Sequence, residues 1–329
     1  MNILVTGGAG YIGSHVAEAL KEAGYIPVVY DNLSTGHREA VPEDVTLIEG
    51  DIHDTALVEK VMREYEIGAV IHFAASSLVG ESMSNPAKYY YNNVEGSQHL
   101  LEAMRRAGVK RIVFSSTAAV YGEPDEIPIK ESSRLCPTNV YGRTKLVIEG
   151  MLADYDMAYG MRYTALRYFN AAGASYKHSI GEDHMPESHL IPLILKTAQG
   201  VRDKIAVYGT DYPTKDGTCI RDYIHVCDLA KAHVLALEHL LRGGQSRVYN
   251  LGSEHGFSVR EMIDYAKKIT EVDFAVVEEA RRAGDPAVLI ASSKRIRAEL
   301  GWVPEYSSVE EIIRTAWRWH KDHPSGYRK

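Results

Sequence analysis

Tyr141 and Lys145 are the side chains of this sequence whose types and spacing most clearly indicate chemistry. Residues four apart on a helix share one face, so a phenol and an ammonium at this spacing can share one pocket. A tyrosine with its reference pKa of about 10 stays protonated at neutral pH and is a poor base. A neighbouring ammonium stabilises the phenolate. The pair therefore predicts a tyrosine that acts as a general base.

The position of the pair in the chain gives it weight. By itself the spacing is a weak signal, because the chain holds 21 tyrosines, and a half-buried tyrosine beside a solvated lysine is the simpler interpretation. Here the pair follows an apolar run at 111–115 and the hydroxyl-rich dipeptide Ser116-Thr117. A hydroxyl at the end of that expected strand can bridge the base and a substrate hydroxyl. Thr117 therefore joins the candidate catalytic residues.

A second motif opens the chain, where an apolar run leads directly into Thr6-Gly-Gly-Ala-Gly-Tyr-Ile-Gly13. A glycine-rich turn between a strand and a helix lets backbone N–H groups approach a pyrophosphate. Asp31 follows the next expected strand, at the spacing of an acidic residue that binds the adenosine ribose and repels a 2′-phosphate. These features predict the binding of NAD in preference to NADP. The nearby Arg38 weakens that preference. The alternative is a tight structural turn followed by a helix-capping aspartate.

The elements that must position these residues alternate between strand and helix patterns. Strands are expected at 3–6, 26–30, 45–49, 69–73, 111–115 and 163–168, and helices at 12–23, 55–65, 86–107 and 139–159. Strands that are apolar throughout and separated by helices predict a doubly wound, Rossmann-like α/β fold with a parallel sheet. We expect an NAD-binding domain over 1–172 and a smaller α/β substrate-binding region over 173–329. Roughly residues 220–245 are expected to return to the main sheet.

Composition narrows the classes of partner. The chain has 329 residues and a net charge of −7, which argues against nucleic acids and anionic membranes as partners. Three cysteines without C-x-x-C spacing, and no leader or long apolar stretch, predict a cytoplasmic protein without disulfides. The 14 histidines are scattered, so no metal site is expected. His178, His184 and His189 are interpreted as solvated or hydrogen-bonding loop residues.

Further runs give the chain a family resemblance over essentially its whole length. They are His72-Phe-Ala-Ala75, Tyr168-Phe-Asn170, Asp211-Tyr-Pro-Thr214, Arg221-Asp-Tyr-Ile-His-Val226 and Arg281-Arg-Ala-Gly-Asp285. With the glycine turn and the Tyr-x-x-x-Lys pair, they resemble the extended short-chain dehydrogenase/reductase family, and within it the UDP-glucose 4-epimerases. The Asp-Tyr-Pro-Thr and Arg-Arg-x-Gly-Asp runs are the most specific to that group.

The resemblance implies an isomerase of galactose metabolism that interconverts UDP-glucose and UDP-galactose through transient oxidation at carbon 4 with tightly bound NAD. It implies that Tyr141 removes the proton of the 4-hydroxyl and that Lys145 anchors the nicotinamide ribose and lowers the tyrosine pKa. Thr117, where the family more often has serine, is implied to hydrogen-bond the same hydroxyl. The oxidised sugar then presents its other face. The resemblance also implies a homodimer through helices like 86–107 and 139–159.

The same resemblance assigns residues to the two ligands. The implied cofactor-binding residues are Gly7, Gly10, Tyr11, Ile12, Gly13, Asp31, Asn32, Asp51, Ile52, Phe73, Ala74, Ala75, Asn92, Tyr141, Lys145 and Phe169. The implied substrate-binding residues are Thr117, Tyr141, Asn170, His189, Leu190, Tyr208, Arg221, Arg282 and Asp285. The two arginines suit a diphosphate, because guanidinium forks match phosphate oxygens.

The sequence departs from the family pattern at three positions. Ser77 stands where some members place a lysine against the cofactor, which implies looser NAD binding. His189 replaces a usual asparagine. Val288 is our placement of a residue that gates the sugar's 2-position, and an intermediate aliphatic group there suggests tolerance for UDP-N-acetylhexosamines.

Other functions compete with this interpretation. A 4,6-dehydratase needs an added acid and base, and Ala118 and Ala119 occupy the positions where those enzymes carry them, so dehydration is disfavoured. Epimerases for UDP-glucuronate or UDP-pentoses share the chemistry at carbon 4 and stay open. From another class, a non-catalytic NAD-sensing protein of the same fold is the alternative, although such proteins usually lose the tyrosine or the lysine.

Overall fold

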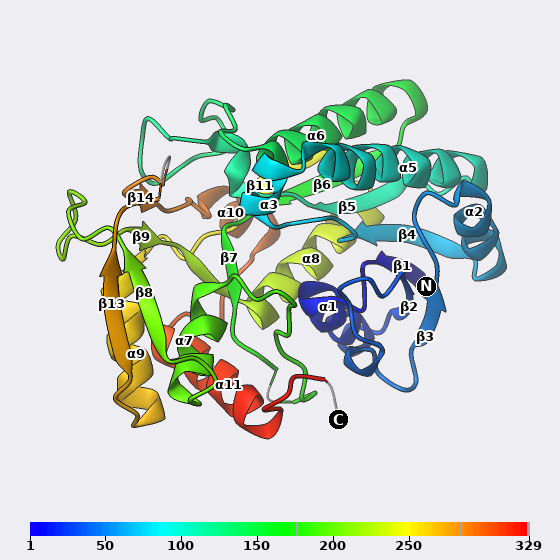
Figure 1. Cartoon of the computed structure of the whole chain (residues 1–329). Coiled ribbons are helices and arrows are strands. Elements are labelled where there is room, and N and C mark those ends of the chain that lie inside the picture. The colour runs from blue at the N-terminus through cyan, green and yellow to red at the C-terminus, as the bar shows by residue number, and fades with distance from the viewer. Residues whose placement is uncertain (176, 283–284, 328–329) are drawn as a thin grey trace.

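The structure is a computed structural model that describes residues 1–175, 177–282 and 285–327. A seven-stranded parallel sheet forms its centre, with the strand order β11-β6-β5-β4-β1-β2-β3 (Figure 1). Its strands are β1 (Asn2–Thr6), β2 (Ile26–Asp31), β3 (Thr46–Glu49), β4 (Ile67–His72), β5 (Arg111–Ser115), β6 (Arg162–Arg167) and β11 (Arg247–Asn250). The predicted doubly wound, Rossmann-like α/β fold is confirmed.

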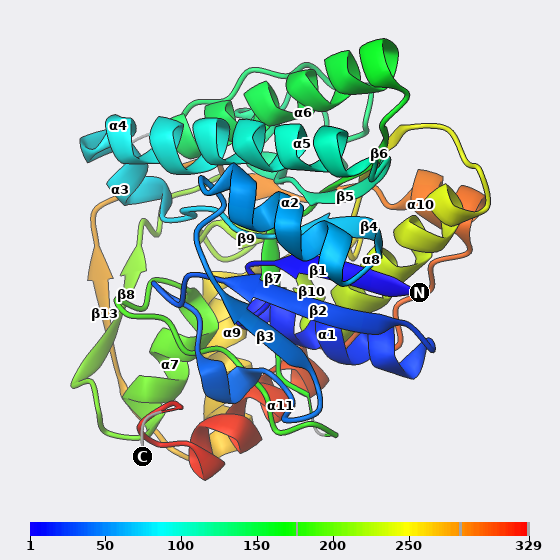
Figure 2. The same cartoon turned by 90° about the vertical axis from the view of Figure 1, so that its right-hand side faces the viewer.

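Helices cover both faces of this sheet (Figures 1 and 2). One face packs against α1 (Tyr11–Glu22) and α8 (Val226–Leu241), and the other against α2 (Thr55–Glu64), α5 (Gly96–Ala107) and α6 (Val140–Tyr159). Successive strand side chains point to opposite faces, so in β1 Ile3 and Val5 enter the first core and Leu4 enters the second. This explains why central strands such as β1 carry apolar residues on both faces.

The expected helix at 86–107 is not uniform. It consists of α4 (Pro86–Tyr89), a π-helical segment (Tyr90–Glu95) and α5, and it follows a short helix α3 (Val79–Ser84). Pro86 opens it, and the side chain of Asn85 caps it by accepting from the backbone N–H of Lys88. π-helical segments are frequent at functional sites, and this one carries the candidate cofactor residue Asn92.

The second half of the chain builds three small sheets and a third hydrophobic core. The sheets pair β7 (Asn170–Ala172) with β10 (Tyr223–His225), β8 (Lys204–Tyr208) with β13 (Ala275–Glu279), and β9 (Ile220–Arg221) with β12 (Phe257–Ser258) and β14 (Val288–Leu289). The core lies among α7 (Leu190–Ala198), α9 (Val259–Thr270) and α11 (Val309–Asp322), while α10 (Lys294–Leu300) contacts α8. Two short 3-10 helices, Arg38–Ala40 and Ala118–Tyr121, complete the fold.

Residues 220–245 reach the main sheet in a different way from the one expected. The strand in this stretch, β10, pairs with β7 in a separate sheet, and it is α8 that packs against the main sheet. The strand that joins the main sheet is β11, which follows α8 and pairs with β6. Because β11 occupies the edge beside β6, the strand of this stretch does not join the main sheet, and the helix makes the return.

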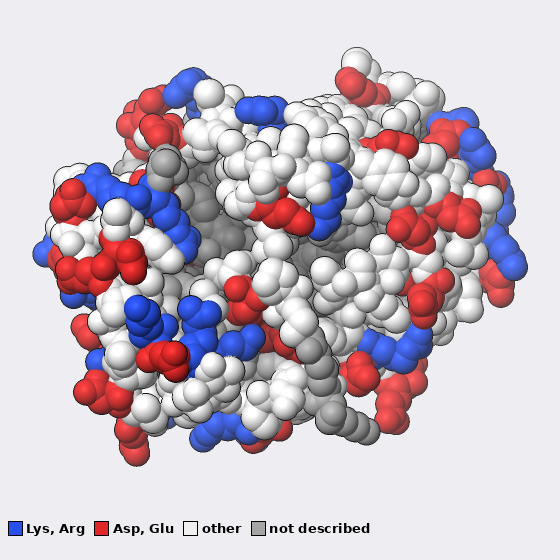
Figure 3. Space-filling model, viewed as in Figure 1, with Lys and Arg blue, Asp and Glu red and all other residues white. Residues whose placement is uncertain are grey.

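Figure 3 shows the surface hollowed between the part built on the main sheet and the part that carries β8, β13 and α9. In doubly wound folds, ligands bind at the carboxyl ends of the strands of the main sheet. None of the helices in the described part of the chain combines the length and apolar character needed to cross a membrane.

Five buried histidines in the described part of the chain make the stability of this fold depend on pH. Burial lowers the pKa of His15, His233 and His320 to about 4 and that of His72 and His225 to about 3. Below about pH 6.5 the unfolded chain therefore binds more protons than the folded one, and each histidine removes up to ~1.4 kcal/mol of stability per pH unit. We expect the melting temperature to fall as the pH is lowered from 6.5 to 4.

The measurement is a series of thermal unfolding curves by circular dichroism between pH 4 and 8. Burial lowers the pKa of His184, but its carboxylate partners raise it overall to about 10. The pH dependence of its contribution to stability therefore has the opposite sign, and that contribution is smallest at high pH. Imidazole resonances provide the control, because the five buried rings are expected to show no titration between pH 5 and 8. A melting temperature constant down to pH 4.5 would contradict this account.

Candidate active site

The glycine-rich turn lies between the carboxyl end of β1 and the start of α1. Gly7 has a φ of +72°, and a Cβ on Gly13 would lie 2.2 Å from the Gly7 carbonyl oxygen. Both positions therefore require glycine. Gly10 caps α1 without a side-chain hydrogen bond, so the first amides of the helix have no side-chain acceptor at the cap. Such amides bind an anionic phosphate group well.

Asp31 ends β2 beside this turn and is 7% exposed. Its carboxylate oxygens accept hydrogen bonds of 2.9 Å from the backbone N–H groups of Ala9 and Leu33. Burial raises the pKa of this carboxyl. Each oxygen has a second lone pair, so Asp31 can hold the turn and still accept ribose hydroxyls. Arg38 is paired with Glu49 at 3.0 Å.

Asn32, Asp51 and Ile52 lie next to Asp31, as the assignment to one adenosine site requires. The amide of Asn32 donates to the Asp51 carboxylate over 3.0 Å. Partial burial raises the pKa of Asp51, but hydrogen bonds from His53 and Asn32 lower it overall. Ile52 is buried, and a Cβ at Gly96 would lie 2.6 Å from its Cδ1.

The loop after β4 closes the turn from the other side. The backbone N–H groups of Phe73 and Ala74 both donate to the Thr6 carbonyl, at 2.8 and 3.1 Å. A Cβ on Gly7 would lie 2.6 Å from the Ala74 nitrogen, so this loop fits against glycine alone. Ala75 follows in the same half-buried loop, and Ser77 is exposed.

Asn93 is a structural residue of this site that the sequence did not single out. It is fully buried in the π-helical segment and bonds both the N–H and the carbonyl of Ser76, at 2.8 and 3.0 Å. Its amide also donates to the Thr144 hydroxyl at 3.1 Å, and it accepts from Asn92 at 3.1 Å. Asn93 thereby ties the loop after β4 to the start of α6.

The reactive pair lies in the first turns of α6, which Asn139 caps through a 2.7 Å bond from the Gly142 N–H. The Lys145 ammonium lies 5.9 Å from the centre of the Tyr141 ring and donates to the Ser115 carbonyl at 2.8 Å. Thr117 hydrogen-bonds the Tyr141 side chain. The structure therefore brings the three predicted catalytic residues together at the carboxyl end of β5.

Burial dominates the protonation of this pair. It raises the pKa of Tyr141 to about 12, against a lowering by the hydrogen bond with Thr117. It also lowers the pKa of Lys145 to about 7, although the charge of Glu149 raises it. The structure thus differs from the expectation that Lys145 lowers the tyrosine pKa. The reason is that both groups are desolvated, which disfavours the phenolate and the ammonium alike.

A buried ion pair between Arg167 and Glu149 was not predicted from the sequence, and the Glu149 charge acts on Lys145. The Arg167 Nε and the Glu149 Oε1 lie 2.9 Å apart, and their side chains are 4% and 6% exposed. Glu149 also accepts from Ser116 at 2.5 Å, and Arg167 donates to the Tyr121 hydroxyl at 2.8 Å. Arg167 is the one charged residue of the strand expected at 163–168. A charge in that context was the signal available in the sequence.

The residues assigned to the nucleotide sugar gather around β8 and β9. The Arg282 guanidinium stacks over the ring of Tyr208 at 4.0 Å. Arg221 forms an ion pair with Asp285 and donates to the Ile220 carbonyl at 2.7 Å. Of the run 281–285, Ala283 and Gly284 lie outside the described residues.

Three further residues considered from the sequence lie near this group or near the loop after β5. Asn170, at the start of β7, donates to the Asp222 carbonyl at 2.9 Å. Phe169 is half-buried against the cluster of Ala118 and Val120, next to the catalytic loop. Val288 is half-buried in β14 and pairs with Ile220 beside Arg221.

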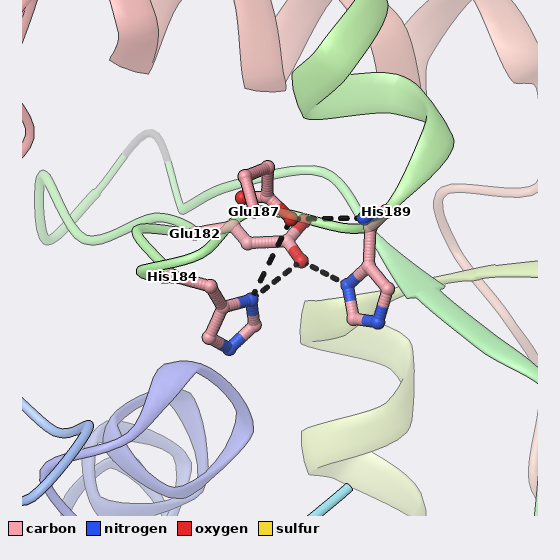
Figure 4. Close-up of side chains that lie close together, drawn as sticks. All are labelled: Glu182, His184, Glu187 and His189. Carbon is pink, nitrogen blue, oxygen red and sulfur yellow. Dashed lines mark hydrogen bonds and ion pairs between the residues drawn. The ribbon is translucent and has the colours of Figure 1, made fainter. Parts of the chain in front are cut away.

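The loop before α7 holds His189 in an ionic cluster with Glu182, His184 and Glu187, and Leu190 begins the helix (Figure 4). His189 and His184 both face the buried carboxylate of Glu182, and the His184 Nδ1 lies 3.2 Å from its Oε1. Burial raises the pKa of Glu182, but the two histidines lower it overall to about 2. The loop histidines are therefore paired. His178 likewise contacts Glu22 at 3.0 Å. This arrangement was not visible from scattered histidines in the sequence.

Known proteins match the chain over its full length. The model of the NAD dependent epimerase/dehydratase family matches residues 3–252. UDP-glucose 4-epimerase of Halalkalibacterium halodurans is 55% identical over 327 residues, which cover 99% of this chain and 98% of that protein. Crystal structures of UDP-glucose 4-epimerase from Brucella ovis with NAD and from Bifidobacterium longum with NAD+ and UDP both give TM-scores of 0.94. Their identities are 53% and 38%, covering 96% and 99% of this chain and 97% and 100% of theirs.

Proposed function

This chain belongs to the NAD dependent epimerase/dehydratase family, and we propose that it is an isomerase that interconverts UDP-glucose and UDP-galactose with tightly bound NAD. The observation that carries the proposal is the meeting of two predicted motifs at one edge of the sheet. The Tyr141–Thr117–Lys145 group lies at the end of β5, and Asn93 joins the start of α6 to the loop packed on the glycine turn.

The residues around the turn fit a dinucleotide. The close contacts at Gly7 and Gly13 leave room for backbone alone, α1 starts without a side-chain cap, and Asp31 presents a carboxylate beside them. We assign the pyrophosphate to Tyr11 and Ile12, and the adenosine to Asp31, Asn32, Asp51 and Ile52. Phe73, Ala74, Ala75, Asn92 and Phe169 line the rest, with Lys145 on the nicotinamide ribose. Bound NAD supplies a reversible hydride acceptor for carbon 4 of the sugar.

Tyr141 moves the proton of the 4-hydroxyl. Its pKa of about 12 keeps the phenol protonated in the protein itself, so added positive charge at the site is needed to make it a base near neutral pH. Tyr141 and Lys145 would hold the nicotinamide end of NAD, and the positive charge of its oxidised form would favour the phenolate. Thr117 bridges Tyr141 and the sugar hydroxyl, so the proton passes between neighbouring oxygens. The turning of the sugar presents the other face of carbon 4, and this change of face inverts the alcohol. The same phenol can then return the proton.

The substrate side of the proposal rests on charge. We assign the diphosphate to Arg221 and Arg282. The rest of the sugar nucleotide is assigned to Asn170, His189, Leu190, Tyr208 and Asp285. Asp285 pairs with Arg221 and so orients its guanidinium fork. Arg282 stacks on Tyr208, which limits its rotamers in the same way.

The direct test is an assay of the purified protein with UDP-galactose and no added NAD. We expect UDP-glucose to form, because retained NAD is regenerated in each cycle. Failure to convert UDP-galactose, even after NAD is supplied, would refute the proposal. UDP-glucuronate and UDP-pentoses, assayed in parallel, test the alternative substrates that share the chemistry at carbon 4.

Gly13→Ala is expected to reduce the NAD retained on purification at least ~10-fold. The new Cβ would meet the Gly7 carbonyl oxygen at 2.2 Å, so the turn must shift away from the geometry that admits a pyrophosphate. The measurement is the NAD content of the denatured protein by absorbance and enzymatic cycling. Gly150→Ala in α6 is the matched control, because nothing lies within 4 Å of its Cβ. Equal NAD in both variants would exclude this role for the turn.

Val288 supports a second, smaller proposal. A half-buried aliphatic side chain of intermediate size, one strand away from Arg221, favours some activity on UDP-N-acetylhexosamines. We expect epimerisation of UDP-N-acetylglucosamine above background, and Val288→Tyr to remove that activity while sparing UDP-galactose. Background activity of the unaltered enzyme on UDP-N-acetylglucosamine would remove the proposal.

The organisation of the chain follows from these assignments. We propose that residues 1–172 bind NAD and residues 173–329 bind the sugar nucleotide, in a cytoplasmic enzyme. We also propose a homodimer through α5 and α6, supported by the exposed apolar side chains of Tyr91, Val147 and Tyr159 on these helices and the adjoining segment. Light scattering is expected to give about twice the chain mass of 36.6 kDa.

A further inference from the structure

We propose that Glu182, His184, Glu187 and His189 form a binding site for one divalent transition-metal ion of the zinc class. The residues come from one segment of eight positions, but the backbone turns so that their side chains converge (Figure 4). One donor atom from each lies within 4.8 Å of the donor atoms of the other three. His189 is also assigned to the substrate side of the proposed epimerase, but metal binding by this cluster does not require that activity.

The donor atoms already have the relative arrangement of a ligand set. The His184 Nδ1 lies 3.2 Å from the Glu182 Oε1 and 3.9 Å from the Glu187 Oε1, and the His189 Nδ1 contacts the same Glu182 oxygen. In a tetrahedral zinc site, bonds of 2.0–2.2 Å place neighbouring donors about 3.4 Å apart. Small rotations of the side chains are enough to reach that spacing.

A buried, unpartnered oxygen is an independent indication of a missing ligand. The side chains of Glu182 and Glu187 are only 5% and 4% exposed. Within the described residues, the Glu187 Oε2 is buried and has no hydrogen-bond partner. A buried carboxylate oxygen without a partner is costly, and binding of a cation would remove that cost.

The ligand types select the class of metal. Two imidazoles and two carboxylates suit a borderline ion such as Zn²⁺, whereas Ca²⁺ and Mg²⁺ prefer all-oxygen sites. Both histidines present Nδ1 to the cluster, and Figure 4 shows the other ring nitrogen of His189 pointing away from it. A metal on Nδ1 would thus leave that nitrogen as an N–H donor.

The cluster lies between the starts of two helices, so a bound ion would affect the stability of the fold. The His184 ring meets the ring of Tyr11 edge-on, with centres 6.2 Å apart, and Tyr11 begins α1 at the glycine turn. His189 and Leu190 begin α7 on the substrate side. A bound ion would therefore link the start of α1 to the start of α7, and it should raise the melting temperature of the protein.

The test uses Co²⁺ as a spectroscopic probe and Zn²⁺ as a competitor, with the full-length protein treated with a chelator and then dialysed. We expect one equivalent of Co²⁺ with the visible bands of a four-coordinate site, displacement by Zn²⁺, and a higher melting temperature with either ion. Glu182→Gln and His184→Asn should each weaken binding at least ~10-fold. His178→Asn, an adjacent loop histidine outside the cluster, should bind as the unaltered protein does.

The competing account is a closed network in which protonated histidines neutralise the two carboxylates. It predicts no saturable Co²⁺ binding by the unaltered protein, and that result alone would overturn the proposal whether or not the variants fold. Binding that survives in both cluster variants and is lost in His178→Asn would also overturn it. None of these readouts depends on turnover, so they are unaffected by the outcome of the UDP-galactose assay.

Discussion

Replacing Tyr141 by phenylalanine is expected to lower the turnover of UDP-galactose by ~10³-fold or more and to leave UDP binding nearly unchanged. A general base contributes typically 10²–10⁴-fold to the rate, and here the same phenol must also return the proton. The substitution removes one oxygen from a ring that is held by burial and by the start of α6. The residues proposed to bind the nucleotide, Tyr208 and Arg221, are unaffected because they belong to other strands.

The measurement is the initial rate of UDP-glucose formation together with a UDP titration by calorimetry. Tyr155→Phe is a matched control, because it makes the same change further along α6, where Tyr155 packs against Tyr159. It is expected to keep full activity. A loss of less than tenfold in Tyr141→Phe would show that the base lies elsewhere. Loss of UDP binding in step with turnover would instead point to a general distortion of the site.

Glu149→Gln is expected to destabilise the fold by ~3–5 kcal/mol, which lowers the melting temperature by roughly 5–15 °C. Arg167 is 4% exposed, and its charge would be left without a carboxylate partner. The cost arises because a buried guanidinium cannot be solvated when its ion pair is broken. The loss of Glu149 would also remove the charge that raises the pKa of Lys145, so that this amine becomes neutral at a lower pH.

Thermal and urea unfolding of three variants would test this account. Glu102→Gln breaks an exposed ion pair with Arg105 and should cost less than ~1 kcal/mol. The double variant Glu149→Met/Arg167→Met should be closer in stability to the unaltered protein than Glu149→Met alone, because both charges leave together. If the double variant lost at least as much stability as the single one, the penalty would come from packing and not from the unpaired charge.

The protonation of the catalytic pair shows what the tertiary structure adds to a correct motif. The Tyr-x-x-x-Lys spacing correctly indicated that Tyr141 and Lys145 share one pocket, since a helix fixes that geometry. It could not indicate how much water the pocket holds. Burial, which depends on β5, the loop after it and the segments packed on α6, raises the pKa of Tyr141 to about 12 and lowers that of Lys145 to about 7.

Local patterns in the sequence determined the architecture of the first half of the chain. Buried parallel strands read as continuous apolar runs, and the strand over 111–115 and the helix to Tyr159 were placed within a residue of their observed bounds. The glycine turn was equally visible, because Gly7 and Gly13 occupy positions that admit no side chain. The parallel sheet followed from the alternation of the elements, whereas the order of its strands came from the structure.

Contacts between distant segments were decided by the tertiary structure alone. Strand β10 pairs with β7, and not with the main sheet, where β11 occupies the edge beside β6. The burial of Arg167 with Glu149 depends on the packing of β6 against α6, which no residue spacing specifies. Even within one loop, the convergence of His184 and His189 on Glu182 depends on backbone turns that the spacing does not show. Short-range periodicity carries information about one element. A buried charge network requires several elements to meet, and only the folded chain brings them together.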